Sequence, residues 1–156
     1  MHENSVIENY AIYHDVGKPF CRFEDEKGVH FPDHENASKH ISQWVFNNTA
    51  ATNLIGWDMV LHKESADKIN YYLINYWSQK DAVTLLCSSL AEVHSNSRLF
   101  GGIRSTSFKS KFKKLDRRGK QILKYYFGDK WNLWACSYDT VIVDITDPFN
   151  FKYLKL

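Results

Sequence analysis

Two histidines and an aspartate stand near the N-terminus where helices are expected to end or begin. His14 and Asp15 are adjacent at the end of an apolar helical stretch, and His34 begins the next helical pattern. Adjacent helical residues point about 100° apart, so His14 and Asp15 can share a metal ion only at a helix end or kink, which Gly17 and Pro19 supply. Imidazoles and carboxylates bind divalent metals, and such metals assist phosphoryl transfer. The pattern predicts a metal site.

Lys18 follows this pair closely and carries a positive charge that can reach a substrate phosphate. We expect it to serve in substrate binding and catalysis, and its alternative is a solvated lysine after a turn. His14 and Asp15 have an alternative too, a hydrogen-bonded pair that ends a helix. For His34 the alternative is a surface position at the start of a helix.

These residues carry a family resemblance. His14-Asp15-Val16-Gly17-Lys18-Pro19, followed by Phe31-x-x-His34-Glu35, resembles the HD superfamily of metal-dependent phosphohydrolases, and most closely the HD domain of CCA-adding tRNA nucleotidyltransferases. The likeness covers residues 10–45 in detail and 50–97 loosely. A softer likeness to uncharacterised HD proteins of tailed phages involves residues 90–96 and 100–103. The resemblance implies an HD-like helical bundle with His14, Asp15 and His34 as metal ligands.

The same family usually has a histidine on a preceding helix and a late aspartate. Only His2 lies upstream here, too near His14 for a separate helix. Either the first ligand is missing, or His2 replaces it from a mobile N-terminus, or the true start lies further upstream. Glu92 stands where the resemblance places the late acid, so it is a further candidate metal ligand. Its alternative is a glutamate on a helix surface.

Asp58 is a candidate for both metal binding and catalysis. CCA-type HD domains often have a histidine where this chain has Trp57-Asp58. Asp58 and His62 are four residues apart, so on one helix they would face the same side and could share or flank an ion. The alternative is an amphipathic helix whose polar face points outward.

The leading expectation is a phosphohydrolase that acts on a nucleotide or other small phosphoester through metal-activated water. The divalent ion could be Mn, Mg, Fe, Ni or Zn. The alternative is a degenerate, non-catalytic HD module that binds nucleic acid, a nucleotide or a host protein. A third, weaker reading is a phage-encoded inhibitor of host machinery.

Length and composition indicate one globular domain. The 156 residues are 44% hydrophobic and 15% aromatic, with three scattered cysteines and no CxxC pair. We expect a single domain over 1–156 that is soluble and cytoplasmic, in the host cytoplasm if phage-encoded, and has no membrane partner. The net charge of +2 hides an asymmetry. Residues 1–97 carry 7 Lys/Arg against 13 Asp/Glu, whereas residues 98–130 carry 11 against 2.

This basic segment is a candidate for binding phosphate. Lys109, Lys113 and Lys120 are expected to bind substrate or nucleic acid, and to lie on the same side of the molecule as His14 and Asp15 if they do. The alternative is two amphipathic helices whose lysines are simply solvated.

Hydrophobic spacing predicts a mainly α protein with a small C-terminal β element. Helices are expected over 5–14, 34–47, from Thr52 or Asn53 to His62, and over 64–77 and 81–95. Two short basic helices follow, the second over 120–127. A small hairpin is expected between 20–23 and 29–31, and a second hairpin forms the tail at 131–156, with strands at 131–138 and 140–145.

Overall fold

The computed structural model describes residues 1–128, and every structural statement below concerns that part of the chain. The chain begins with α1 (Asn4–Tyr13), the 3-10 turn η1 (Lys18–Phe20), β1 (Phe23–Asp25), β2 (Gly28–His30) and α2 (His34–Val45). It continues with α3 (Thr49–Gly56), α4 (Val60–Lys63), α5 (Ala66–Asn75), α6 (Gln79–Ser95), the 3-10 turn η2 (Ser97–Phe100) and α7 (Thr106–Phe127). The expected mainly α architecture is confirmed.

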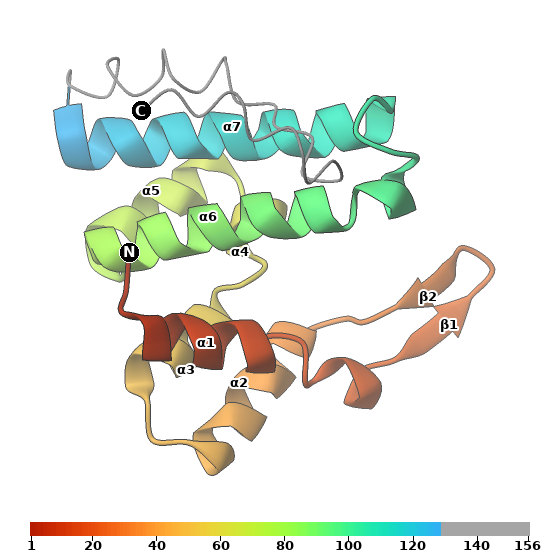
Figure 1. Ribbon diagram of the computed structural model, residues 1–156, viewed down its shortest axis with the longest axis horizontal. Coiled ribbons are helices and arrows are strands. Elements are labelled where there is room, and N and C mark those ends of the chain that lie inside the picture. The colour runs from red at the N-terminus through yellow and green to blue at the C-terminus, as the bar shows by residue number, and fades with distance from the viewer. Residues whose placement is uncertain (129–156) are drawn as a thin grey trace.

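The helices form two groups. α1, α2 and α3 pack together at one end, and α5, α6 and α7 pack together at the other, with α4 between them (Figure 1). α6 runs through the middle, so α7 lies on the opposite side of α6 from α1 (Figure 1). One hydrophobic cluster links the groups and includes Leu54, Leu61, Leu85 and Ile122, all fully buried.

Side-chain caps explain where several helices begin. Asn48, Ser65 and Ser105 each accept a hydrogen bond from a backbone N–H in the first turn of α3, α5 and α7. Ser78 and Asp81 form a reciprocal capping box at the start of α6. Ser105 therefore serves as an ordinary helix cap.

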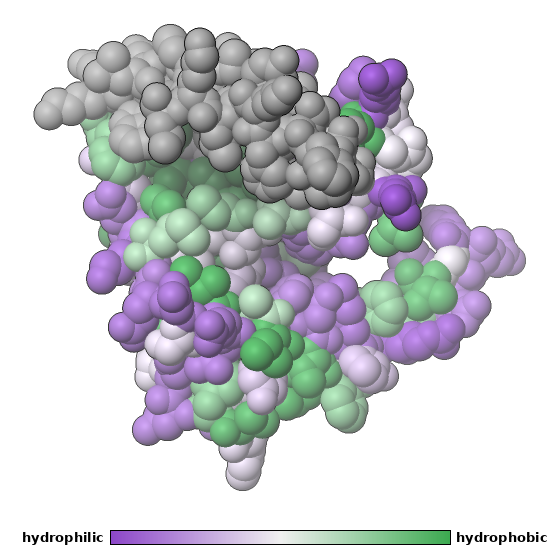
Figure 2. All heavy atoms as spheres, in the orientation of Figure 1, coloured by the Kyte–Doolittle hydropathy of each residue, from purple (hydrophilic) through white to green (hydrophobic). Residues whose placement is uncertain are grey.

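The small hairpin expected after Lys18 is confirmed. β1 and β2 pair antiparallel, with Phe23 opposite His30 and Asp25 opposite Gly28. The hairpin projects away from the helices (Figure 1), and all of its residues are exposed. Figure 2 shows hydrophobic side chains among hydrophilic ones on this arm. Its two ends are the segments that carry Lys18 and His34.

The prediction of one continuous helix from residue 52 or 53 to His62 is wrong. The chain forms α3, then a turn at Trp57-Asp58-Met59, then α4. Trp57 packs against the core and meets Trp77 with ring centroids 6.3 Å apart. Because the turn interrupts the helix, Asp58 and His62 do not share one helical face. The break instead directs Asp58 inward.

The prediction of two short basic helices is also wrong, because α7 is continuous through residues 116–119. Gly119 weakens helix propensity, but it lies where α7 packs on Leu86 of α6, so tertiary packing outweighs that preference.

The expected C-terminal hairpin lies outside the described residues, and the strands that the structure describes are N-terminal. None of the helices within residues 1–128 combines the length and apolar character needed to cross a membrane.

Candidate metal centre

The carboxylate of Asp15 lies between three nitrogen groups just beyond the end of α1. His14 Nε2 is 3.6 Å from Asp15 Oδ2, and His34 Nε2 is 3.5 Å from Asp15 Oδ1. The ammonium of Lys18 donates to Asp15 Oδ2 at 2.6 Å. His34 is 7% exposed and Asp15 38%, so the group stands at the edge of the core with one side open to solvent. The structure thus brings four predicted residues together.

Backbone carbonyls orient both imidazoles. His14 Nδ1 lies 2.9 Å from the carbonyl oxygen of Ala11, and His34 Nδ1 lies 2.9 Å from that of Phe31. A carbonyl only accepts, so each Nδ1 carries a proton and donates it to the backbone. The Nε2 atoms of both rings therefore face Asp15. Metal-binding histidines in proteins are commonly oriented by this type of backbone contact.

Gly17 lets the turn between α1 and η1 approach α2 closely. Its N–H donates to the hydroxyl of the buried Ser38 at 2.8 Å. A Cβ at Gly17 would lie 2.5 Å from the backbone nitrogen of Ser38 and 2.6 Å from the carbonyl oxygen of His34. Its φ of −76° is ordinary, so glycine is needed here for close approach and not for an unusual backbone conformation.

Glu35 fixes the start of α2 from the other side. It accepts from the ammonium of Lys63 on α4 at 2.6 Å, and its own side chain is 13% exposed. Asp33, just before α2, adopts a left-handed backbone conformation with φ 57°. These two features set the direction in which α2 begins and therefore the position of His34.

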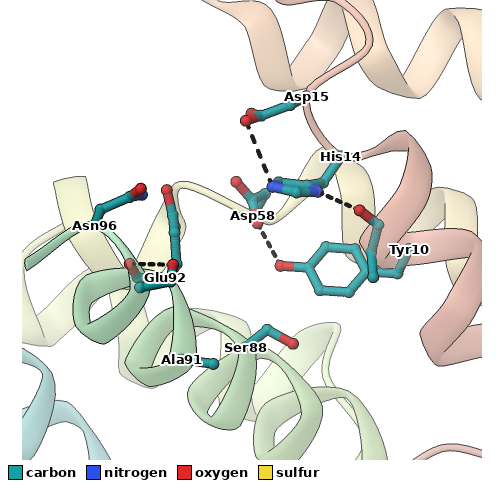
Figure 3. A pocket seen from close by; sticks show the side chains of 10 residues that line it. Tyr10, His14, Asp15, Asp58, Ser88, Ala91, Glu92 and Asn96 are labelled. Carbon is teal, nitrogen blue, oxygen red and sulfur yellow. Dashed lines mark hydrogen bonds and ion pairs between the residues drawn. The ribbon is translucent and has the colours of Figure 1, made fainter. Parts of the chain in front are cut away.

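A pocket of about 410 Å³ opens beside this group, between α1 and α6. His14, Asp15, Asp58 and Glu92 all line it, together with Tyr10 and residues from the second half of α6. In Figure 3, His14 and Asp15 approach from the end of α1, Glu92 from α6, and Asp58 from the turn before α4. His34 meets Asp15 but does not line the pocket, so Asp15 connects the two.

Asp58 is a buried carboxyl at the base of this pocket. It is 4% exposed, and the hydroxyl of Tyr10 donates a hydrogen bond to it. Burial raises its pKa above the ordinary value, while the Tyr10 hydrogen bond and the charge of His14 act in the opposite direction. Burial and the neighbouring Asp58 also raise the pKa of Tyr10. Both groups of this pair therefore hold a proton more tightly than usual.

Glu92 is paired with His62, whose Nε2 lies 3.5 Å from Glu92 Oε2. The His62 hydrogen bond lowers the pKa of Glu92, against the opposing effect of burial. Two carboxyl groups in one pocket thus have pKa values shifted in opposite directions. Asp58 favours a proton more than usual, and Glu92 favours the ionised form.

In the part of the chain that the structure describes, no group of three or more His, Cys, Asp or Glu side chains is arranged to hold a metal ion. Imidazole nitrogens and carboxylate oxygens are donors that bind divalent metals, so the residue types at this site fit a metal although their present arrangement does not enclose one. Lys18 occupies one carboxylate oxygen that a metal would otherwise use.

His2 does not supply the upstream histidine. Its Nε2 binds Asp81 at 2.7 Å, and its backbone N–H donates to the hydroxyl of Thr84. Asp81 is in the first turn of α6, about 16 Å along the helix from Glu92 at the rise of an α-helix. His2 therefore ties the N-terminus to α6 instead of completing the Asp15 group.

The three lysines expected near the site lie elsewhere. Lys109, Lys113 and Lys120 are all exposed on α7, beyond α6 from His14 and Asp15 (Figure 1), and none of them lines the pocket. Lys120 pairs with Asp116 at 3.1 Å. The structure does not bring these lysines to the pocket.

Sequence reasoning missed Tyr10 and the partnership of His62 with Glu92. Tyr10 was visible as the residue four positions before His14, on the same helical face. Nothing in the sequence indicated the His62–Glu92 contact, because α4 and α6 meet only through tertiary packing.

Comparisons with known proteins give no match: no family model, curated protein or solved structure is similar to this chain.

Proposed function

We propose that the protein is a divalent-metal-dependent phosphohydrolase that acts on a nucleotide or another small phosphoester. The observation that carries the proposal is the convergence of His14 Nε2 and His34 Nε2 on opposite oxygens of Asp15, with Lys18 on the same carboxylate. The resemblance of this segment to HD phosphohydrolases supports the same reading.

His14, Asp15 and His34 would hold the ion. A bound divalent metal lowers the pKa of its water ligand and polarises a phosphoryl oxygen. The chain's own groups prepare the rest. Lys18, released from Asp15, places a positive charge where a phosphate would enter, and the protonated form of Asp58 can give a proton to a leaving oxygen in the pocket.

The second function to consider is a non-catalytic module with the same fold. It is favoured by the pairing of Lys18 with Asp15 and by the absence, among residues 1–128, of a group arranged to hold a metal. In that case the Asp15 cluster would serve only to join α1 to α2, and neither metal retention nor hydrolysis would be found.

Metal content separates the two. Protein purified without chelator should contain close to one divalent ion per chain by elemental analysis, and Asp15→Asn and His34→Gln should each lose it. The hairpin offers a matched control, because His30 and Asp25 form an exposed histidine–carboxylate pair at 2.9 Å. Asp25→Asn with His30→Gln should retain the ion.

Hydrolysis of bis-p-nitrophenyl phosphate with added Mn²⁺ tests the reaction itself. We expect activity in the wild type and in the hairpin control, and a loss of about 100-fold or more in Asp15→Asn. Equal metal content and activity in Asp15→Asn and the wild type would contradict the proposal and favour the non-catalytic module.

A further inference from the structure

A second hollow lies where the start of α5 meets the middle of α7. It has a volume of about 600 Å³ and is lined by Ala66 of α5 and by six residues of α7. Those six are Ser110, Lys113, Lys114, Arg117, Arg118 and Gln121. Their spacing of three and four residues places all six on one face of α7. We call this the basic hollow.

We propose that the basic hollow binds the backbone phosphates of single-stranded nucleic acid. Four of its lining residues are cations and none is acidic. Among the described residues, no carboxylate lies within ion-pair distance of any of the four, although other surface cations such as Lys120 and Lys63 have such partners. A concave group of uncompensated positive charges is the electrostatic signature of a phosphate site.

Two of the cations are held in place by the protein. Lys114 donates to the backbone carbonyl of His62, and Arg118 donates to that of Glu64 at 2.7 Å. Arg118 Nε is buried and has no hydrogen-bond partner. Backbone carbonyls fix these side chains without neutralising them, so their charge remains available to an anion. Lys113 and Arg117 are exposed and free to reach a ligand.

The cations continue beyond the hollow, which favours a polymer over a single phosphate. α7 is 22 residues long, about 33 Å, and also carries Lys109, Lys111, Lys120 and Lys124. Tyr125 follows Gln121 by four residues on the same face and is 48% exposed, so it can stack on a base. A membrane is a poorer fit, because stable binding to lipid is strengthened by large apolar side chains among the cations, and Ala66 is the one apolar residue among the described residues that line the hollow.

Fluorescence anisotropy with fluorescein-labelled poly(dT) tests this on the full chain. The variant Lys113→Ala with Arg117→Ala removes two cations from the hollow. Its matched control, Lys109→Ala with Lys124→Ala, removes two cations from the same helix outside the hollow. At low salt we expect about a tenfold loss of affinity in the first and a smaller loss in the second. The slope of log K against log salt should fall by about 1.4 in magnitude in the first.

Equal losses in the two variants, or wild-type binding that does not vary with salt, would overturn the proposal. Binding to phosphatidylserine vesicles without binding to poly(dT) would also overturn it and would indicate a membrane. Displacement of labelled poly(dT) by inorganic phosphate as effectively as by unlabelled poly(dT) would overturn it too and would indicate a single-phosphate site. The charge-conserving variant Lys113→Arg with Arg117→Lys should bind like the wild type and shows that losses do not come from misfolding.

Discussion

At the residue scale, Asp58 is a buried carboxyl whose charge affects stability. Its pKa is raised by burial in the folded protein, so its contribution to stability is full below its ordinary value of 3.8. That contribution is lost as the pH rises through the raised pKa, because the ionised carboxylate is poorly solvated in the pocket. Asp58 therefore works against folding at neutral pH when no metal is bound.

We expect Asp58→Asn to be more stable than the wild type in chelator at neutral pH. Asparagine keeps an oxygen for the Tyr10 hydroxyl and removes the charge, so the difference in Tm should grow from about pH 4 upward. Thermal unfolding across this pH range measures it. A constant difference in Tm would show that Asp58 does not titrate differently on folding.

Tyr10→Phe should have the opposite effect. It removes the hydrogen bond that lowers the pKa of Asp58 and leaves a buried carboxylate without its donor. The expected destabilisation is about 1–3 kcal/mol, and it should be largest where Asp58 is ionised. The same melts measure it, and a variant as stable as the wild type at every pH would show that the hydrogen bond contributes nothing.

At the element scale, the contact of α2 with the turn between α1 and η1 depends on one missing side chain. Gly17→Ala should force the start of α2 away, because the new Cβ would meet backbone atoms of Ser38 and His34 at 2.5 and 2.6 Å. We expect a loss of about 1–3 kcal/mol in the free energy of unfolding and a loss of metal binding, because His34 would separate from Asp15. Urea unfolding and elemental analysis provide the two readouts.

Gly119→Ala on α7 serves as the comparison. Its Cβ would meet only the flexible side chain of Leu86 at 3.3 Å, and alanine favours a continuous helix. We expect this variant to gain about 0.5 kcal/mol in the free energy of unfolding and to bind metal normally. A destabilised Gly119→Ala would mean that the α6–α7 contact is tighter than the packing indicates.

The sequence predicted the helices with clear apolar spacing, such as 81–95, and the hairpin at 20–31. It could not predict the turn at Trp57-Asp58-Met59, because Trp57 continues the helical pattern and only its packing against Trp77 shows why the chain bends there. It also split α7 at Gly119, since the packing against Leu86 that outweighs glycine's weak helix propensity is a long-range effect.

The candidate site was predictable where its residues are close in sequence. His14, Asp15, Lys18 and His34 lie within about 20 residues, and the other three side chains each lie within 3.6 Å of an Asp15 oxygen. That they hold a metal stays a prediction. The positions of Asp58 and Glu92 depend on how α3, α4 and α6 pack, so their place in the sequence did not predict how far they lie from Asp15. For the same reason, the sequence alone could not predict where the basic residues lie relative to the site.

At the scale of the whole molecule, the first proposed site lies between α1 and α6 and the second between α5 and α7, and they share no lining residue. His62 is the contact between them, because its ring pairs with Glu92 and its carbonyl accepts from Lys114. We expect this single contact to leave the two sites independent. Asp15→Asn should lose metal and bind poly(dT) like the wild type, whereas Lys113→Ala with Arg117→Ala should lose poly(dT) binding and keep its metal. Anisotropy and elemental analysis on both variants measure this, and loss of both properties in either variant would show that the sites are coupled.

The placement of these charges also affects how the molecule meets a polyanion. Asp15, Asp58 and Glu92 line the pocket between α1 and α6, whereas the cations of the basic hollow all lie on α7. Within residues 1–128, these acidic groups and the basic hollow thus stand on different elements. The field of a polyanion would favour encounters in which α7 approaches first. Because the two sites share no lining residue, a small substrate could enter the first pocket while the polymer is bound.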